Sequence, residues 1–95
     1  FSAANNFVSI MQYIPLCHIV GATTGGGSGM PFNSELPNGW GVRFSACPVL
    51  DAKGLPTEAG IDPSPGCDVG FDPHAAVDGT DTVLDFAISL LTAGV

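Results

Sequence analysis

The sequence has very few positive charges. Arg43 and Lys53 stand against nine carboxylates, and the net charge is −7. Such a chain repels phosphate backbones, so we expect no nucleic-acid partner. Charged residues of both signs make up 12% of the chain, about half the usual share. A chain of 95 residues has much surface for its volume, and 45% of its residues are hydrophobic. This composition predicts a segment that lies against more protein.

Long apolar runs are missing as well. No stretch approaches the ~20 residues of a membrane-spanning helix, and no basic region followed by an apolar one marks a signal peptide. Cys17, Cys47 and Cys67 lack the spacing of a metal site, and neither a metal nor a cofactor is expected. Cys17 lies in an apolar run and is expected to be a buried thiol. A bridge between Cys47 and Cys67 stays open.

Hydrophobic periodicity predicts an α/β chain that begins with a helix over residues 2–14. One apolar stripe recurs there at spacings of three and four, formed by Ala3, Phe7, Val8, Met11 and Ile14. Pro15 is expected to end this helix, because its ring clashes with the preceding turn. Residues 17–22 follow as a short strand. A helix followed by a strand favours a layered α/β architecture with a largely buried sheet.

A hairpin and a second helix are expected further along. The remaining predicted segments are strands at 32–36 and 40–45, a turn at 51–54, an irregular loop at 60–73 and a helix from about 80 to 91. Asn38-Gly39 closes the hairpin, because both residues tolerate left-handed backbone angles. Thr80 or Asp78 is expected to cap the last helix. Its predicted buried face consists of Val83, Leu84, Ala87, Ile88 and Leu91.

Residues 23–29, Thr-Thr-Gly-Gly-Gly-Ser-Gly, form a glycine-rich loop. Gly25, Gly26 and Gly27 allow positive φ angles and a close approach of the backbone to other groups. The loop lacks the Gly-Lys-Ser/Thr ending of a phosphate-binding loop, and no lysine lies near it. We therefore expect a loop that shapes a substrate cleft or packs beside one.

Ser2 has two interpretations from its position alone. A serine directly before a periodic apolar segment is a good helix N-cap. The same place suits a nucleophile, because the free N–H groups and positive dipole end of a helix can stabilise an oxyanion. His18 and His74 are the chain's two histidines, and they are expected to be a strand residue and a loop residue without a catalytic role.

Asp68, Asp72 and His74 follow no known metal-ligand spacing. Charges in a loop of this kind are usually solvated, and that is the expectation here.

Three segments, in this order, carry a resemblance to a known family. They are Gly-Gly-Gly-Ser-Gly-Met-Pro at 25–31, Ser-Glu-Leu-Pro-Asn-Gly-Trp at 34–40 and Thr-Glu-Ala-Gly-Ile-Asp-Pro at 57–63. With Phe-Ser-Ala-Ala at the start, they resemble the C-terminal part of the catalytic domain of the C-terminal processing (tail-specific) serine peptidases. The likeness is greatest to the tricorn-like and retinoid-binding-protein-like branch. It implies a partial crotonase/ClpP-like spiral core, with the upstream half of the domain and a PDZ-like domain outside this chain.

The resemblance also implies roles for particular residues. Ser2 matches the family's nucleophile, and the backbone N–H of Ala3 matches the oxyanion donor. In the tail-specific branch a lysine base follows the nucleophile by 25 residues, where this chain has Gly27. A Ser-Lys dyad is therefore excluded. The tricorn-like branch uses an upstream histidine and a downstream carboxylate, for which Glu58 is the match; a solvated glutamate is the alternative.

The function that follows is peptide-bond hydrolysis through an acyl-enzyme on Ser2, with a polypeptide substrate and a base from outside this chain. The 95-residue chain alone is expected to be inactive. Two alternatives stay open: a binding module for peptides or hydrophobic ligands, and an inactive structural fragment whose apolar faces another chain covers. Analogy with bacterial relatives implies an extracytoplasmic location.

Overall fold

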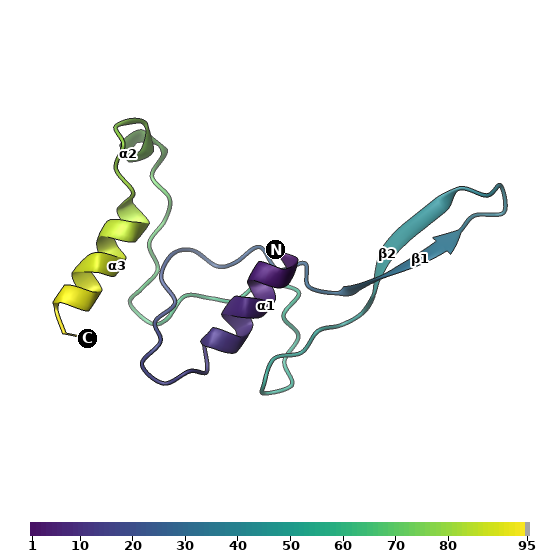
Figure 1. The fold of residues 1–95 in the computed structure, drawn as a ribbon, viewed down its shortest axis with the longest axis horizontal. Helices are drawn as coiled ribbons and strands as arrows, with labels where there is room; N and C mark the ends of the chain where they lie inside the picture. Colours follow the sequence, from purple (N-terminus) through teal and green to yellow (C-terminus); the bar gives the residue numbers. More distant parts are fainter. Residues whose placement is uncertain (95) are drawn as a thin grey trace.

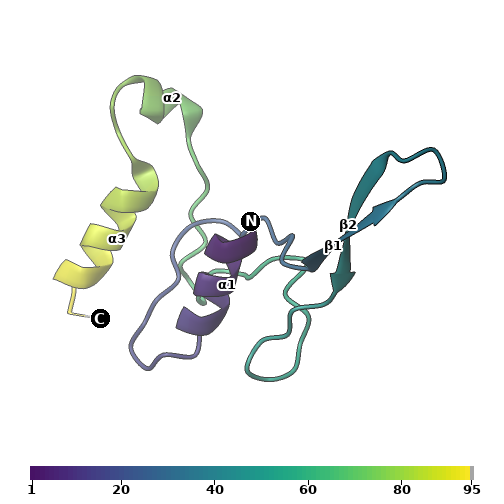
Figure 2. The ribbon, with the colours of Figure 1, turned by 45° about the vertical axis from the view of Figure 1, so that its right-hand side comes forward.

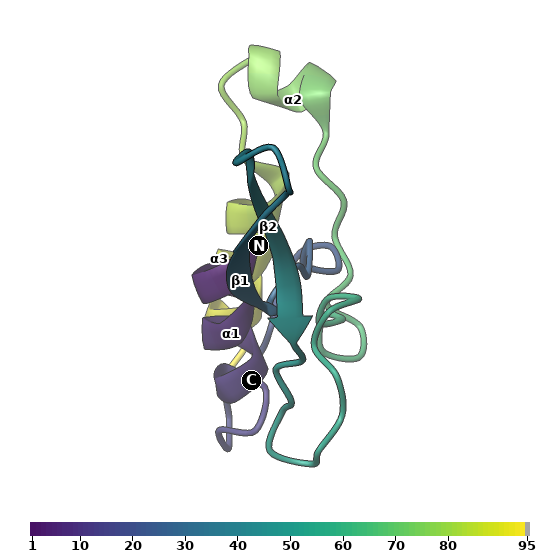
Figure 3. The ribbon, with the colours of Figure 1, turned by 90° about the vertical axis from the view of Figure 1, so that its right-hand side faces the viewer.

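The computed structural model describes residues 1–94 as a long, flat arrangement of three parts. It measures 59 × 36 × 14 Å along its principal axes, and its radius of gyration is 17.5 Å, whereas a compact chain of this length has about 12 Å. A hairpin lies at one end, a central region surrounds the first helix, and two further helices lie at the other end (Figures 1 and 2). The edge-on view in Figure 3 shows how thin the arrangement is.

The first helix, α1 (Ser2–Met11), buries its polar face. Asn5 is 0% and Ser9 is 6% exposed, whereas Phe7 is 63% and Ile10 is 66% exposed. The predicted helix is confirmed, but it ends at Met11, four residues before Pro15. No member of the apolar stripe is buried, because that side of α1 has no covering layer within residues 1–94; Ala3, Phe7 and Ile14 are exposed, and Val8 and Met11 are half-buried. This helix presents its apolar side to solvent.

The predicted strand at 17–22 is not formed. Residues 19–21 instead run extended beside residues 64–69, with one parallel bridge between Gly21 and Asp68. The backbone bonds from Gly21 N to Cys67 O (3.0 Å) and from Val69 N to Gly21 O (3.2 Å) hold the two segments together. The segment has the extended conformation that was expected, but it lacks a second neighbour that would complete a sheet.

The hairpin consists of β1 (Met30–Glu35) and β2 (Gly41–Cys47), which pair antiparallel. Phe32 lies opposite Phe44, and their ring centroids are 5.7 Å apart. Gly39 closes the turn with a φ of 85°. The hairpin was predicted correctly in place and turn; each strand ends one residue farther from the turn and extends two residues farther at its other end than predicted. It projects away from the rest of the chain (Figure 1).

A compact turn at 51–54 is also confirmed. The carboxylate of Asp51 accepts hydrogen bonds from the backbone of Lys53 and Leu55, both at 2.9 Å. Its other oxygen accepts one from the Tyr13 hydroxyl at 2.6 Å. That bond raises the pKa of Tyr13 and lowers the pKa of Asp51. The turn is thereby fastened to the segment that follows α1.

Two helices end the chain. The short α2 (Pro73–Val77) was not predicted, and it contains His74, which was expected in a loop. Asp72 caps it by accepting from His74 N and Ala75 N. The predicted last helix is confirmed as α3 (Thr82–Thr92), but its cap is Asp81 rather than Thr80 or Asp78.

The predicted buried face of α3 is wrong in part. Val83 and Ala87 are half-buried, and the side chain of Val83 lies 3.6 Å from where a Cβ on Gly21 would be. Leu84, Ile88 and Leu91 are 54%, 50% and 72% exposed. The helix therefore packs one edge on the extended segment and leaves the other edge open.

The centre of this structure is mostly polar. The buried hydrophobic residues are Ile61 and Cys67, while the buried polar ones are Asn5, Ser9, Ser28 and Thr57. The accessible surface is 6793 Å², against about 5,100 Å² for a compact protein of this mass. Many large hydrophobic side chains contribute to this surface, among them Phe7, Leu16 and Trp40, which are 63%, 96% and 71% exposed.

The three cysteines are unbridged in this structure. Cys67 is the buried one, Cys17 is half-buried and Cys47 is exposed. The expectation of a buried thiol at Cys17 is therefore wrong, because α3 covers the neighbouring extended segment only along one edge. Within residues 1–94, no helix has the length and apolar character needed to cross a membrane.

Candidate active site

Two backbone segments cross at the centre of the molecule, the glycine-rich loop and residues 57–60. A Cβ on Gly26 would lie 2.0 Å from the carbonyl oxygen of Glu58, and one on Gly60 would lie 2.1 Å from that of Thr24. Both glycines also have positive φ angles, of 69° and 98°. Only glycine allows this approach, so the packing of the loop against residues 57–60 requires glycine at positions 26 and 60.

Ser2 lies at this crossing. Its N–H donates to the carbonyl oxygen of Gly26 at 3.1 Å, which joins the start of α1 to the glycine-rich loop. The N-cap of α1 is Phe1, and no side chain caps the helix, so the interpretation of Ser2 as a capping residue is wrong. Ser2 has a φ of 50°, a conformation that costs a residue with a Cβ of order 1–3 kcal/mol. Such strain is concentrated at functional sites.

Within residues 1–94, the N–H of Ala3 at the same helix end has no hydrogen-bond acceptor. The N–H of Ser2 bonds to Gly26, and those of Ala4 and Asn5 approach the carbonyl oxygen of Phe1 at 3.2 and 3.5 Å. Ala3 has no preceding turn to donate to, and the first N–H groups of any helix lack intrahelical partners. An anionic oxygen next to Ser2 would meet this donor and the positive end of the helix dipole.

Glu58 is fastened to the other side of the loop. Its Oε2 accepts from Ser28 N at 3.1 Å and Gly29 N at 3.0 Å, and its carbonyl oxygen accepts from Gly27 N at 3.1 Å. Ser2 and Glu58 thus bond to adjacent loop residues, Gly26 and Gly27. The structure brings them together through the loop and gives no direct hydrogen bond between their side chains among the described residues. Glu58 is exposed and its carboxylate also accepts from two backbone N–H groups, so it is a solvated glutamate that holds the loop.

The loop also borders open space. Glu58 and Gly29 line a shallow cavity of about 310 Å³ with Ser45, Ala46, Cys47 and Pro48. On the other side, the ring of Phe1 covers Gly25, where a Cβ would come within 2.6 Å of it. The three glycines predicted to shape a cleft therefore lie between Phe1 and residues 57–60, and Gly29 of the same loop lines the cavity.

Asn5 is the residue that sequence reasoning missed. Its amide nitrogen donates to Ser28 Oγ and to Thr57 O (3.0 Å), and its amide oxygen accepts from Thr24 Oγ1. Asn5 lies outside the apolar stripe of α1, and the sequence analysis assigned it no role. The available signal was its spacing, because position i+3 lies on the same helix face as Ser2.

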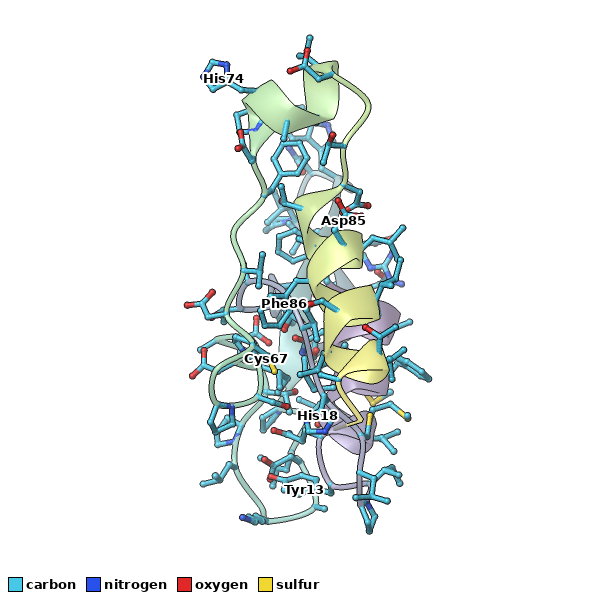
Figure 4. The ribbon with its side chains drawn as sticks, turned by 90° about the vertical axis from the view of Figure 1, so that its left-hand side faces the viewer. Tyr13, His18, Cys67, His74, Asp85 and Phe86 are labelled. Carbon is cyan, nitrogen blue, oxygen red and sulfur yellow. The ribbon has the colours of Figure 1, made fainter. Side chains whose placement is uncertain are left out.

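The two histidines lie away from this crossing. His18 lines a cavity of about 150 Å³ with side chains of α3, and His74 stands on α2. Figure 4 shows His74 at the α2 end and His18 nearer to Tyr13, with α3 between them. Neither hydrogen-bonds to Ser2 or Glu58 in the part of the chain that the structure describes. Asp72 serves as the cap of α2, which accounts for one member of the acidic group beside His74.

Comparison with known proteins gives the family. The sequence profile of peptidase family S41 matches residues 1–65. A crystal structure from Parabacteroides merdae ATCC 43184, described as that of a "putative peptidase", is 52% identical with a TM-score of 0.82. The match covers 95% of this chain and 28% of that one, so the chain spans little more than a quarter of the length of this relative. No curated protein matches the chain. The glycine-rich crossing and the start of α1 both fall within the matched region, and the chain belongs to peptidase family S41.

Proposed function

We propose that this chain is the nucleophile-bearing segment of a serine peptidase, with Ser2 as the attacking residue. One observation carries the proposal: Ser2 is strained, at φ 50°, at the first turn of α1, and its side chain does not cap the helix. A capping serine would have an extended backbone and a hydroxyl bonded to the helix. Strain of this kind resembles the sharp turn that exposes the nucleophile of other hydrolases before a helix.

The chemistry assigns one role to each group. Ser2 Oγ attacks the carbonyl carbon of a peptide bond as its proton passes to a base outside this chain. The oxyanion that forms accepts a hydrogen bond from Ala3 N–H and is stabilised by the helix end. Collapse of this intermediate breaks the C–N bond, releases the amine with a proton from the base, and leaves an acyl-enzyme on Ser2 that water hydrolyses.

Glu58 supports the site through the backbone. Because its carboxylate holds Ser28 and Gly29, and its carbonyl oxygen holds Gly27, it fixes the loop whose Gly26 bonds to Ser2. Gly27 occupies the place of the lysine base in the tail-specific branch. We therefore propose the tricorn-like branch, in which the base is a histidine from the rest of the catalytic domain.

The test is covalent labelling of the full-length protein with a fluorophosphonate probe. We expect stoichiometric labelling of wild type on Ser2, located by mass spectrometry of the tryptic peptide, and none in Ser2→Ala. The matched control is Ser34→Ala, since Ser34 lies on an exposed strand of the hairpin, and it should label as wild type does.

Equal labelling of Ser2→Ala and wild type would show that another residue is the nucleophile. Wild type that binds a polypeptide substrate without any labelling would instead favour a binding module with the same fold.

A further inference from the structure

We propose that Asn5 is a positioning residue, which locks both ends of the glycine-rich loop onto α1 and so sets the place of Gly26 relative to Ser2. This inference rests on the proposed function for its catalytic consequence. The juxtaposition behind it is independent of that function: one fully buried amide contacts the loop on both sides of its three consecutive glycines.

The amide of Asn5 has a single consistent orientation. The carbonyl oxygen of Thr57 can only accept, so the Asn5 atom that lies 3.0 Å from it is the nitrogen. The amide oxygen then faces Thr24, whose hydroxyl must donate to it. Thr24 Oγ1 in turn accepts from Ile61 N at 2.8 Å. The second amide hydrogen goes to Ser28 Oγ. Both donors of the amide and its acceptor are therefore used.

The position of these partners gives the network its effect. Thr24 and Ser28 flank Gly25, Gly26 and Gly27, so Asn5 fixes the two ends of the loop. In the middle of the loop, the carbonyl oxygen of Gly26 accepts a hydrogen bond from the N–H of Ser2. Ser2 lies one helical turn before Asn5. Ser28 also donates its N–H to Glu58 Oε2 at 3.1 Å. Asn5 is thus connected to Ser2 through Thr24, the loop backbone and Gly26, and to Glu58 through Ser28.

Burial explains why this position takes an amide. Asn5 and Thr57 are both 0% exposed, and a buried polar group is tolerated only when it is hydrogen-bonded. An apolar side chain at position 5 would remove one of the two donors to Thr57 O, which would keep Gly60 N at 3.2 Å. It would also remove the acceptor to which the Thr24 hydroxyl donates. An aspartate would have the same shape, but its oxygens could not donate to Ser28 or Thr57 unless it were protonated.

The experiment measures loop order and nucleophile reactivity in the same full-length protein. Asn5→Asp should raise amide hydrogen exchange in the peptide that covers residues 23–29, while exchange in α3 stays as in wild type. It should also slow fluorophosphonate labelling of Ser2 between about tenfold and about a hundredfold, the effect of a small misplacement of reacting groups. Affinity for a polypeptide ligand should stay within about twofold of wild type, as expected when positioning rather than binding is lost.

Matched variants separate positioning from general damage. Asn33→Asp makes the same change on an exposed strand of the hairpin, where the residue makes none of these bonds, and should leave the labelling rate near that of wild type. Thr24→Val removes the hydroxyl that bonds to both Asn5 and Ile61 N without changing the shape of the side chain, and should act as Asn5→Asp does. Thr24→Ser keeps the hydroxyl and should restore the rate. If Asn5→Asp does not fold, Ser28→Ala decides the question, because it removes the hydroxyl that accepts from Asn5 and keeps the backbone N–H that bonds to Glu58.

Each outcome has one meaning. Unchanged amide hydrogen exchange at residues 23–29 in a folded Asn5→Asp protein, or in Thr24→Val, would show that Asn5 does not hold the loop. Raised exchange with an unchanged labelling rate overturns the positioning role. Wild type that is not labelled on Ser2 overturns the proposed function instead, and the exchange measurement then still decides whether Asn5 holds the loop.

Discussion

Replacing Gly26 with alanine should separate the two reasons why the loop needs glycine. The backbone there has a φ of 69°, which disfavours any side chain. In addition, the new Cβ would lie 2.0 Å from the carbonyl oxygen of Glu58, 2.8 Å from its carbonyl carbon and 2.9 Å from Gly60 N. All three atoms belong to the backbone, so no side-chain rotation relieves the contact.

The size of the effect follows from a second glycine. Gly39, in the hairpin turn, has a φ of 85° with nothing within 4 Å of a Cβ, so Gly39→Ala costs only backbone strain, about 1–2 kcal/mol. Gly26→Ala adds overpacking, about 1–3 kcal/mol, because the chain must move by more than about 1 Å to reach a normal contact distance. We expect a total loss of about 2–5 kcal/mol.

Urea unfolding of the full-length protein measures both variants against wild type. Gly26→Ala should also slow the labelling of Ser2, because the carbonyl oxygen at position 26 accepts a hydrogen bond from the Ser2 N–H. Gly39→Ala should leave the labelling rate unchanged. Equal stability losses in the two variants would refute the reasoning, since they would mean that the contact with Glu58 is absent or relaxes freely.

Two further predictions concern the contact of Tyr13 and the open faces of the helices. The hydrogen bond to Asp51 raises the pKa of Tyr13 above 10.0 and lowers that of Asp51 below 3.8. It therefore stabilises the turn between these values and is lost as the pH rises through the raised pKa or falls through the lowered one. Asp51→Asn should lower the pKa of Tyr13, read from tyrosinate absorbance because this is the chain's single tyrosine, and Asp68→Asn should not. Since Phe7 and Ile10 are exposed, the isolated 95-residue chain should self-associate in ultracentrifugation, and replacing both with glutamate should reduce association. A monomeric wild-type chain that melts cooperatively would contradict this prediction.

Local signals predicted most of the regular elements. The periodic spacing of apolar residues placed α1 and α3, and Asn38-Gly39 placed the hairpin turn, because helices and tight turns depend on neighbours along the chain. The strand expected at 17–22 failed for the opposite reason. A strand needs hydrogen-bonding partners on another segment, and here residues 64–69 supply one edge alone.

The candidate site was only partly predictable. The glycine-rich loop, Ser2 and Glu58 were recognised from ordered motifs, and the family match over residues 1–65 agrees with that order. Asn5 was missed, because amphipathic periodicity assumes that the apolar side of a helix faces inward. In α1 the polar side does, since it contacts the glycine-rich loop.

The sequence by itself determined the family, the helices α1 and α3, the hairpin and the need for glycine at a close backbone crossing. Those features are encoded in residue types and their order. The tertiary structure alone decided that Ser2 is strained instead of capping, that Glu58 holds Ser28 and Gly29, and that Asn5 joins both ends of the loop to α1. Each of these depends on hydrogen bonds between segments 19 to 52 residues apart or on a backbone angle imposed by such contacts, and no local pattern in a sequence specifies them.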